Sequence, residues 1–233
     1  MKYELKKNCI YCFKAIGKRT KGHIISKSIG GTLIYPLACK DCNHKLGGDV
    51  EANLSKDYWV NFAKKKLGLS DFKIDSALKF DGRQNKYAVE VQPSGKERYV
   101  PPITDKMTWR ILAKISYESA AFFIGNRVFL PTFDEYRKFI ITGVPDLSEK
   151  SIVRACSGFP WEPVHIIEFS PNKELFAIIV HLFNAYIFTS VFWQPVGGPN
   201  IFPARVIIDL DNKKTLFLKP SDDGNTWKII AGY

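Results

Sequence analysis

Two short cysteine pairs, CIYC at residues 9–12 and CKDC at residues 39–42, flank the stretch GHIIS at residues 22–26 and decide the fold. Each CxxC pair forms a tight turn that aims two thiolates at one point, and this spacing is typical of one tetrahedral zinc ion. A disulfide pair or a redox dithiol is the alternative. The lysine-rich flanks, the lack of a secretory segment and a fifth cysteine, Cys156, favour the metal. We therefore expect a structural zinc ion held by Cys9, Cys12, Cys39 and Cys42.

The composition is that of a folded protein with a substantial core. The chain has 233 residues, of which 45% are hydrophobic, so it can form one large domain or two small ones. The longest apolar patch, residues 174–193, is interrupted by His181, Asn184 and Thr189, and no run reaches the length of a membrane span. We expect no membrane partner and a cytoplasmic location.

The positive charge is concentrated at the start of the chain. The formal net charge is +11, and residues 1–45 contain ten Lys or Arg against Glu4 and Asp41, which accounts for eight of those charges. Four thiolates with one zinc ion would remove two positive charges and leave the segment basic. Such a bias favours a polyanion, and nucleic acid above all, over simple solubility. We expect phosphate contacts from Lys14, Lys18, Arg19, Lys21, Lys27 and Lys45.

The segment between the cysteine pairs predicts a β-hairpin followed by a helix. Residues 22–26 have the pattern of a short strand, Gly30-Gly31 indicates a turn, and residues 33–38 predict a returning strand that ends at the second pair. Helical spacing of apolar residues begins at Asp41, and Gly47-Gly48 can kink or break this helix.

The rest of the chain predicts an α+β fold. We expect helices at 49–69, 103–124 and 133–142, strands at 72–80 and 86–92, and a linker at 93–102. Further strands are expected at 151–156, 164–169, 175–183, 186–193, 205–210 and 215–218, forming a mostly antiparallel sheet packed by the long helix. We divide the chain into a zinc-stapled module (1–70), a hairpin and linker (71–102) and an α+β accessory region (103–233).

The hairpin and helix carry residues suited to phosphodiester hydrolysis. This reaction needs a base for the attacking water, a cation for the charge on the leaving oxygen, and a rigid frame. Neutral His23 can take a proton at neutral pH. Asn43 offers an amide oxygen to Mg²⁺ or Mn²⁺, and with His44 it lies in the first helical turn, where both can face back toward His23. The zinc ion would be structural, because four thiolates leave no position for water.

These residues also carry a resemblance. Cys9-x-x-Cys12, then GHIISKSIGG at residues 22–31, then Cys39-x-x-Cys42-Asn43, resembles the zinc-containing branch of the HNH, or ββα-metal, endonuclease family over about residues 9–55. The resemblance implies that His23 is the general base, that Asn43 binds the catalytic metal and that the four cysteines hold zinc. It further implies a DNA endonuclease that leaves a 5′-phosphate and a 3′-hydroxyl.

One position departs from the family pattern. The family usually has Asp or Glu just before the base histidine as a second protein ligand to the catalytic metal, whereas this chain has Gly22. Asp41, His44 or Asp49 could supply the missing ligand, with His44 preferred because it adjoins Asn43. Alternatively water and substrate phosphate fill the metal shell, or the site is weakened or inactive. His44 could also contact only phosphate or solvent.

The sequence therefore supports one leading hypothesis and two alternatives. The leading one is a DNA endonuclease of restriction, phage-defence or mobile-element type, in which the N-terminal module cuts and the remainder positions DNA, reads a modified base or binds a protein partner. The first alternative is a catalytically weakened zinc-dependent DNA-binding module. The second is a zinc-containing protein-interaction component with little affinity for DNA.

Overall fold

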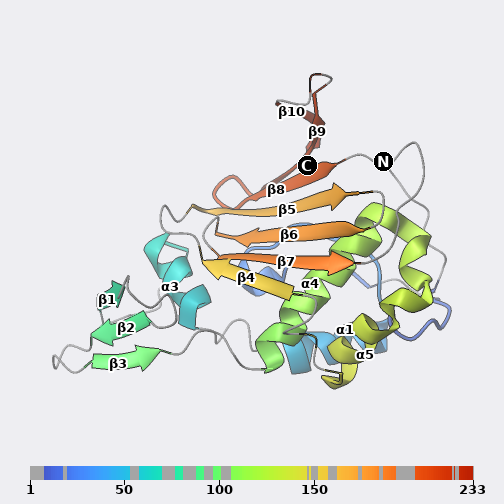
Figure 1. Cartoon of the computed structure of the whole chain (residues 1–233), viewed down its shortest axis with the longest axis horizontal. Helices are drawn as coiled ribbons and strands as arrows, with labels where there is room; N and C mark the ends of the chain where they lie inside the picture. The colour runs from blue at the N-terminus through green and yellow to red at the C-terminus, as the bar shows by residue number, and fades with distance from the viewer. Residues whose placement is uncertain are drawn as a thin grey trace.

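The computed structural model describes residues 8–17, 20–52, 58–69, 77–80, 88–91, 97–100, 106–145, 147, 152–156, 162–172, 175–183, 186–192, 203–221, 223 and 226–232. Within these residues the main feature is a seven-stranded antiparallel sheet with the long helix α4 (Lys106–Ile124) packed across one face (Figure 1). The predicted α+β fold class is confirmed.

The large sheet has the strand order β10-β9-β8-β5-β6-β7-β4. Its strands are β4 (Ile152–Cys156), β5 (Val164–Pro171), β6 (Phe176–Leu182), β7 (Tyr186–Phe192), β8 (Ala204–Asp209), β9 (Lys214–Pro220) and β10 (Trp227–Gly232). In β6, Phe176, Ile178, Val180 and Leu182 are buried and alternate with less buried residues, as expected for a strand with one face on a core. The six predicted strands are confirmed. The sequence analysis missed β10, an edge strand whose Ile229 and Ile230 are exposed and which therefore lacks this alternation.

Helix α4 is buried on nearly every side. All residues from Ile111 to Ala121 are buried, because the helix packs against the sheet and also contacts α5 (Asp134–Thr142) and residues of the N-terminal segment, residues 8–52. The predicted helices at 103–124 and 133–142 are thus confirmed, with α5 ending at Gly143 in the left-handed conformation.

A small antiparallel sheet separates the N-terminal segment from α4 in the chain. It contains β1 (Ala77–Phe80), β2 (Ala88–Val91) and β3 (Glu97–Val100), in that order. The first two strands confirm the predicted hairpin. The prediction of a linker over 93–102 is wrong at Glu97–Val100, which form β3. The prolines that suggested a linker, at positions 93, 101 and 102, lie outside this short and polar strand.

The N-terminal segment has the predicted hairpin-and-helix arrangement, with very short strands. His23 pairs with Ile34 in an isolated antiparallel bridge, and Ile24 N–H donates to Leu33 O over 3.1 Å. A 3-10 turn, η1 (Lys27–Ile29), follows the first arm. Helix α1 (Lys40–Leu46) continues through a π-helical turn, η2 (Gly47–Glu51), so Gly47-Gly48 widens the helix without breaking it; α3 (Tyr58–Lys66) comes next.

Two adjacent glycines make the turn of this hairpin possible. Gly30 has a φ of 90°, a conformation that favours glycine, and its N–H donates to Lys27 O. At Gly31 a Cβ would collide with the backbone of Ile25. The turn predicted from Gly30-Gly31 is therefore confirmed, and the second glycine is required because two stretches of backbone meet there.

One cluster of buried side chains runs through the described residues. It joins Ile10 and Ile24 of the N-terminal segment to Leu112 of α4 and Ile178 of β6. The boundaries at residues 70 and 102 remain a prediction. No helix in the part of the chain that the structure describes is long and apolar enough to cross a membrane.

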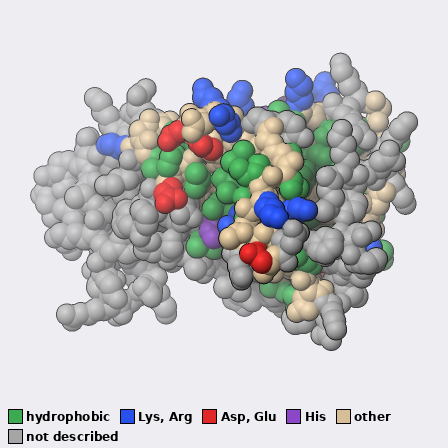
Figure 2. Space-filling view, turned by 90° about the horizontal axis from the view of Figure 1, so that it is seen from above, with side chains coloured by type: hydrophobic (Ala, Val, Ile, Leu, Met, Phe, Trp, Pro, Cys, Tyr) green, Lys and Arg blue, Asp and Glu red, His purple; other side chains and the backbone are tan. Residues whose placement is uncertain are grey.

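The face seen from above Figure 1 carries charges of both signs. Figure 2 shows Lys and Arg side chains around a central group of hydrophobic side chains, with Asp and Glu side chains among them. This face is therefore not a surface of one sign of charge. Most of the basic excess of the sequence lies in residues 1–45.

Candidate metal centre and catalytic site

The four cysteines of the N-terminal segment converge on one point. Their sulfur atoms all lie within 4.8 Å of one another, and Cys12 Sγ is 3.8 Å from Cys39 Sγ. Sulfurs around a tetrahedral zinc ion, with bonds of ~2.3 Å, are separated by about 3.8 Å. None of the four forms a disulfide. The donor set and spacing fit zinc, and the expected metal ligands are positioned to hold an ion.

Local backbone structure aims each sulfur. In the first turn Cys9 N–H donates to Lys14 O and Phe13 N–H to Cys9 O, over 2.9 and 3.0 Å respectively. In the second, Cys39 is the N-cap of α1 and Cys42 lies in its first turn, where the helix dipole favours negative charge. A bond of 3.1 Å from Ile10 N–H to Leu37 O ties the two turns together.

The sulfur cluster needs a cation to hold several thiolates. Burial, and next the charge of Cys9, raise the pKa of the Cys42 thiol above its ordinary value. A metal ion reverses this effect, because it stabilises the deprotonated sulfur directly. A metal ion held by these four sulfurs would join the two turns and hold the hairpin between them.

The hairpin and the helix bring Asn43 against the residue that precedes His23. A Cβ placed on Gly22 would lie 3.1 Å from Asn43 Oδ1 and 3.6 Å from Tyr35 O. The amide oxygen predicted to bind a catalytic metal thus faces the position where a carboxylate would complete a pair of oxygen ligands. Glycine places no side chain there, so the site lacks the acidic residue that the family pattern has before the histidine.

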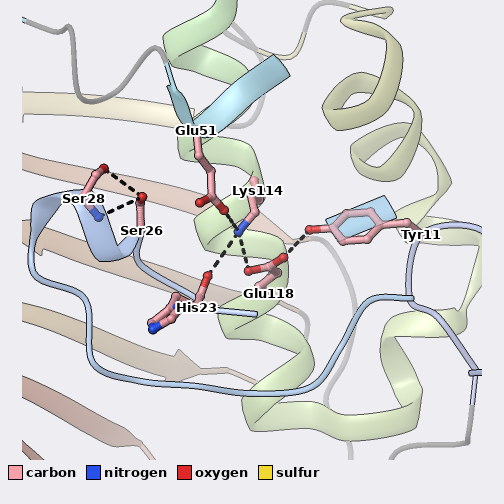
Figure 3. Close-up of polar contacts among 7 residues, drawn as sticks. All are labelled: Tyr11, His23, Ser26, Ser28, Glu51, Lys114 and Glu118. Atoms are coloured by element: carbon pink, nitrogen blue, oxygen red, sulfur yellow. Dashed lines mark hydrogen bonds and ion pairs between the residues drawn. The ribbon is translucent and has the colours of Figure 1, made fainter. Parts of the chain in front are cut away.

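His23 is half-buried and held by its backbone. Its carbonyl oxygen accepts a hydrogen bond of 3.3 Å from Lys114 Nζ, while its imidazole points away from that contact (Figure 3). Burial lowers the pKa of His23; Glu51 opposes this, and the positive charges of Lys27 and Lys114 add to it. The imidazole is therefore neutral at pH 7, the state that a general base requires.

A buried polar network lies behind His23, and the sequence analysis missed it. Lys114 Nζ contacts Glu51 Oε1 and Glu118 Oε2, each over 2.7 Å, and Tyr11 O–H donates to Glu118 Oε1 over 2.7 Å (Figure 3). Burial lowers the pKa of Lys114, but Glu118 and Glu51 outweigh it, and the pKa is raised. The signal in the sequence was a Lys-x-x-x-Glu pair within the mostly apolar stretch 111–124.

The other predicted ligands and lysines lie at the surface. Asp41, His44 and Asp49, the proposed replacements for an acid at position 22, are all exposed. Lys14, Lys21, Lys27 and Lys45 are exposed as well, as phosphate-contacting residues must be. Lys18 and Arg19 lie outside the described residues. The roles of all these side chains remain predictions.

Comparison with protein families identifies this segment. Residues 9–59 match the model of a family described as HNH endonuclease. The resemblance to HNH endonucleases is confirmed. The match includes the four cysteines, His23 and Asn43, and also Glu51 of the buried network; residues 9–59 are called the HNH segment below. Comparison with curated proteins and with solved structures gave no match.

Proposed function

We propose that this protein is a metal-dependent DNA endonuclease in which the HNH segment hydrolyses phosphodiester bonds. The observation that carries the proposal is the placement of Asn43 Oδ1 beside residue 22, next to the proposed base His23, in a helix whose start belongs to the four-cysteine cluster. This arrangement offers the hydrolysis reaction its base, its metal ligand and its rigid frame.

In the proposed mechanism, His23 takes a proton from the attacking water. Its half-buried ring, with a lowered pKa, is free to accept that proton at neutral pH. Asn43 Oδ1 would hold Mg²⁺ or Mn²⁺, which stabilises charge on the phosphate and leaving oxygen. Lys14, Lys21, Lys27 and Lys45, all exposed, would bind neighbouring DNA phosphates together with Lys18 and Arg19.

The second protein ligand to the catalytic metal is proposed to come from outside position 22. Asp41, His44 and Asp49 are the candidates; all three are exposed and belong to α1 or the π-helical turn that continues it. His44 adjoins Asn43 and remains our preferred candidate. If none of these side chains binds the metal, water and the substrate phosphate would complete its coordination shell, and the metal affinity would be lower.

Gly22 supports a second candidate function. A zinc-stapled segment that lacks an acidic ligand could bind DNA through its lysines without cutting it. The setting we propose for either function, restriction, phage defence or a mobile element, rests on the family resemblance alone, and a cytoplasmic location remains a prediction from the sequence.

A cleavage assay separates the two functions. We expect purified protein to nick or cut plasmid DNA with Mg²⁺ or Mn²⁺, and His23→Ala to lower the rate at least ~100-fold at unchanged zinc content. His181→Ala is the matched control, because His181 is a half-buried histidine of β6 outside the site. Binding without cutting by the wild type, with a steep loss of affinity in salt, would favour the binding module.

A further inference from the structure

The ammonium group of Lys114 uses all of its donors on three parts of the molecule. It contacts Glu51 of the HNH segment, Glu118 of α4 itself, and the main-chain oxygen of His23. A lysine has three N–H donors, so the third contact completes its bonding. The two carboxylates already neutralise the buried ammonium group, so the hydrogen bond to the His23 carbonyl oxygen is not needed for charge balance.

The peptide unit after His23 is held from both sides. The His23 carbonyl accepts from Lys114, and the N–H of the same unit, on Ile24, donates to Leu33 O across the hairpin. The hairpin has only one bridged residue pair at this point, His23 with Ile34. Tyr35 N–H donates to Gly22 O over 3.0 Å on the other side of this pair, and a pairing of two backbone bonds is short for holding one backbone direction. Lys114 adds a restraint from outside the hairpin.

The restraint comes from a rigid source. The Lys114 side chain is 3% exposed, that of Glu118 is 7% exposed, and α4 is buried around this turn. Tyr11 from the first cysteine turn donates to the same Glu118, so the network links the metal staple, the hairpin and the long helix. Figure 3 shows that the His23 imidazole points out of this network.

We propose that Lys114, which lies outside the segment matched to the HNH family, is a positioning residue for His23. It fixes the peptide unit of His23 and Ile24 and thereby the direction of the imidazole. This inference rests on the proposed function for its effect on cleavage, whereas its structural part stands independently. A small displacement of a catalytic group lowers a rate by about 100-fold, so the loss of this restraint is measurable.

The test compares two variants that differ only at residue 114. Glu118→Gln keeps the shape of the side chain and one acceptor oxygen for Lys114, and its amide N–H can donate to the Tyr11 hydroxyl oxygen, so it is the control. Glu118→Gln with Lys114→Met removes the ammonium without leaving the buried Glu118 carboxylate unpaired, while the Glu51 side chain, which is 20% exposed, has access to water; this protects folding. We expect the control to keep kcat and KM within about twofold of wild type, and the double variant to lose about 100-fold in kcat with KM within about twofold.

Amide hydrogen exchange tests the restraint without relying on cleavage. In the double variant the Ile24 amide should exchange at least about tenfold faster than in the control, while the Cys9 amide, bonded to Lys14 O in the first cysteine turn, should not change. Equal Ile24 exchange in the two variants, or an equal rise at Cys9, would overturn the proposal. If the wild type cuts no DNA, the proposed function fails, and the exchange result alone decides the role of Lys114.

Discussion

Acid should destabilise this protein through one buried histidine, His165 of β5. The His165 ring is fully buried; Nε2 lies 2.8 Å from Ile29 O, and Nδ1 accepts a bond of 3.1 Å from Phe183 N–H. The proton of the neutral ring therefore sits on Nε2 and is donated to Ile29, in the turn after the first arm of the hairpin. A second proton, on Nδ1, would face the N–H of Phe183.

The size of the effect follows from the pKa. Burial lowers the pKa of His165 to about 4, against an ordinary value of ~6.5 in the unfolded chain. The unfolded state binds the extra proton first, so the stability is present above pH ~6.5 and is lost as the pH falls toward 4. Between pH 7.5 and 4.5 this one group should reduce the free energy of unfolding by about 2.5 kcal/mol.

The assay is urea unfolding of wild type and His165→Gln at both pH values. Glutamine does not titrate and can still donate to Ile29, so the loss between the two pH values should be about 2.5 kcal/mol smaller in the variant. Acid release of zinc affects both proteins and cancels in the difference. Equal losses in the two proteins would show that His165 is already protonated in the fold, or that its bonds to Ile29 and Phe183 are not those described.

Three further predictions concern the HNH segment. Gly31→Ala should cost more than about 2 kcal/mol in urea unfolding, because its Cβ would collide with the backbone of Ile25; Gly48→Ala, with open space around it, is the control, and equal effects would contradict this view. Removing zinc with a chelator should lower the thermal midpoint by several degrees. Replacing Cys39 by Ser should lower it similarly and should remove most of the bound zinc. Full zinc occupancy in that variant would argue against the staple. Gly22→Asp should reduce the Mn²⁺ concentration for half-maximal cleavage about tenfold, because the new carboxylate would adjoin Asn43 Oδ1. Mn²⁺ should also raise the thermal midpoint of this variant more than that of wild type. A variant no more responsive to Mn²⁺ than wild type would refute this placement.

Much of the metal centre could be predicted because its signal is local. The two-residue spacing of a CxxC turn places its two sulfurs close together, so the convergence of Cys9, Cys12, Cys39 and Cys42 could be predicted from spacing alone. The strands of the large sheet were also readable, since alternation such as that of β6 reflects burial on one face. By contrast, β10 is an exposed edge strand and β3 is a short polar strand between prolines, and neither has a hydrophobic period to detect.

The contact between Lys114 and His23 could not be predicted, because its partners are 91 residues apart and no period relates them. A charged residue within an apolar helix indicates that a partner exists, and Glu118 four residues later offered one sufficient partner. The second carboxylate and the His23 carbonyl depend on how the hairpin docks on α4. That docking is decided by tertiary packing, which the sequence pattern does not encode.

Helix α4 gives a physical reason why the HNH segment and the large sheet occur in one chain. Besides Lys114, Tyr117 donates to Ile10 O over 2.8 Å in the first cysteine turn, and Ser116 accepts from Ser190 of β7 over 2.6 Å. Buried bonds of this kind are directional, and an arrangement that left them unmade would cost on the order of 1–3 kcal/mol for each group. The helix therefore favours one orientation of the cysteine turn and hairpin over the alternatives. A general base needs that single orientation more than it needs additional stability, so we expect the accessory region to be required for cleavage even where it does not contact DNA.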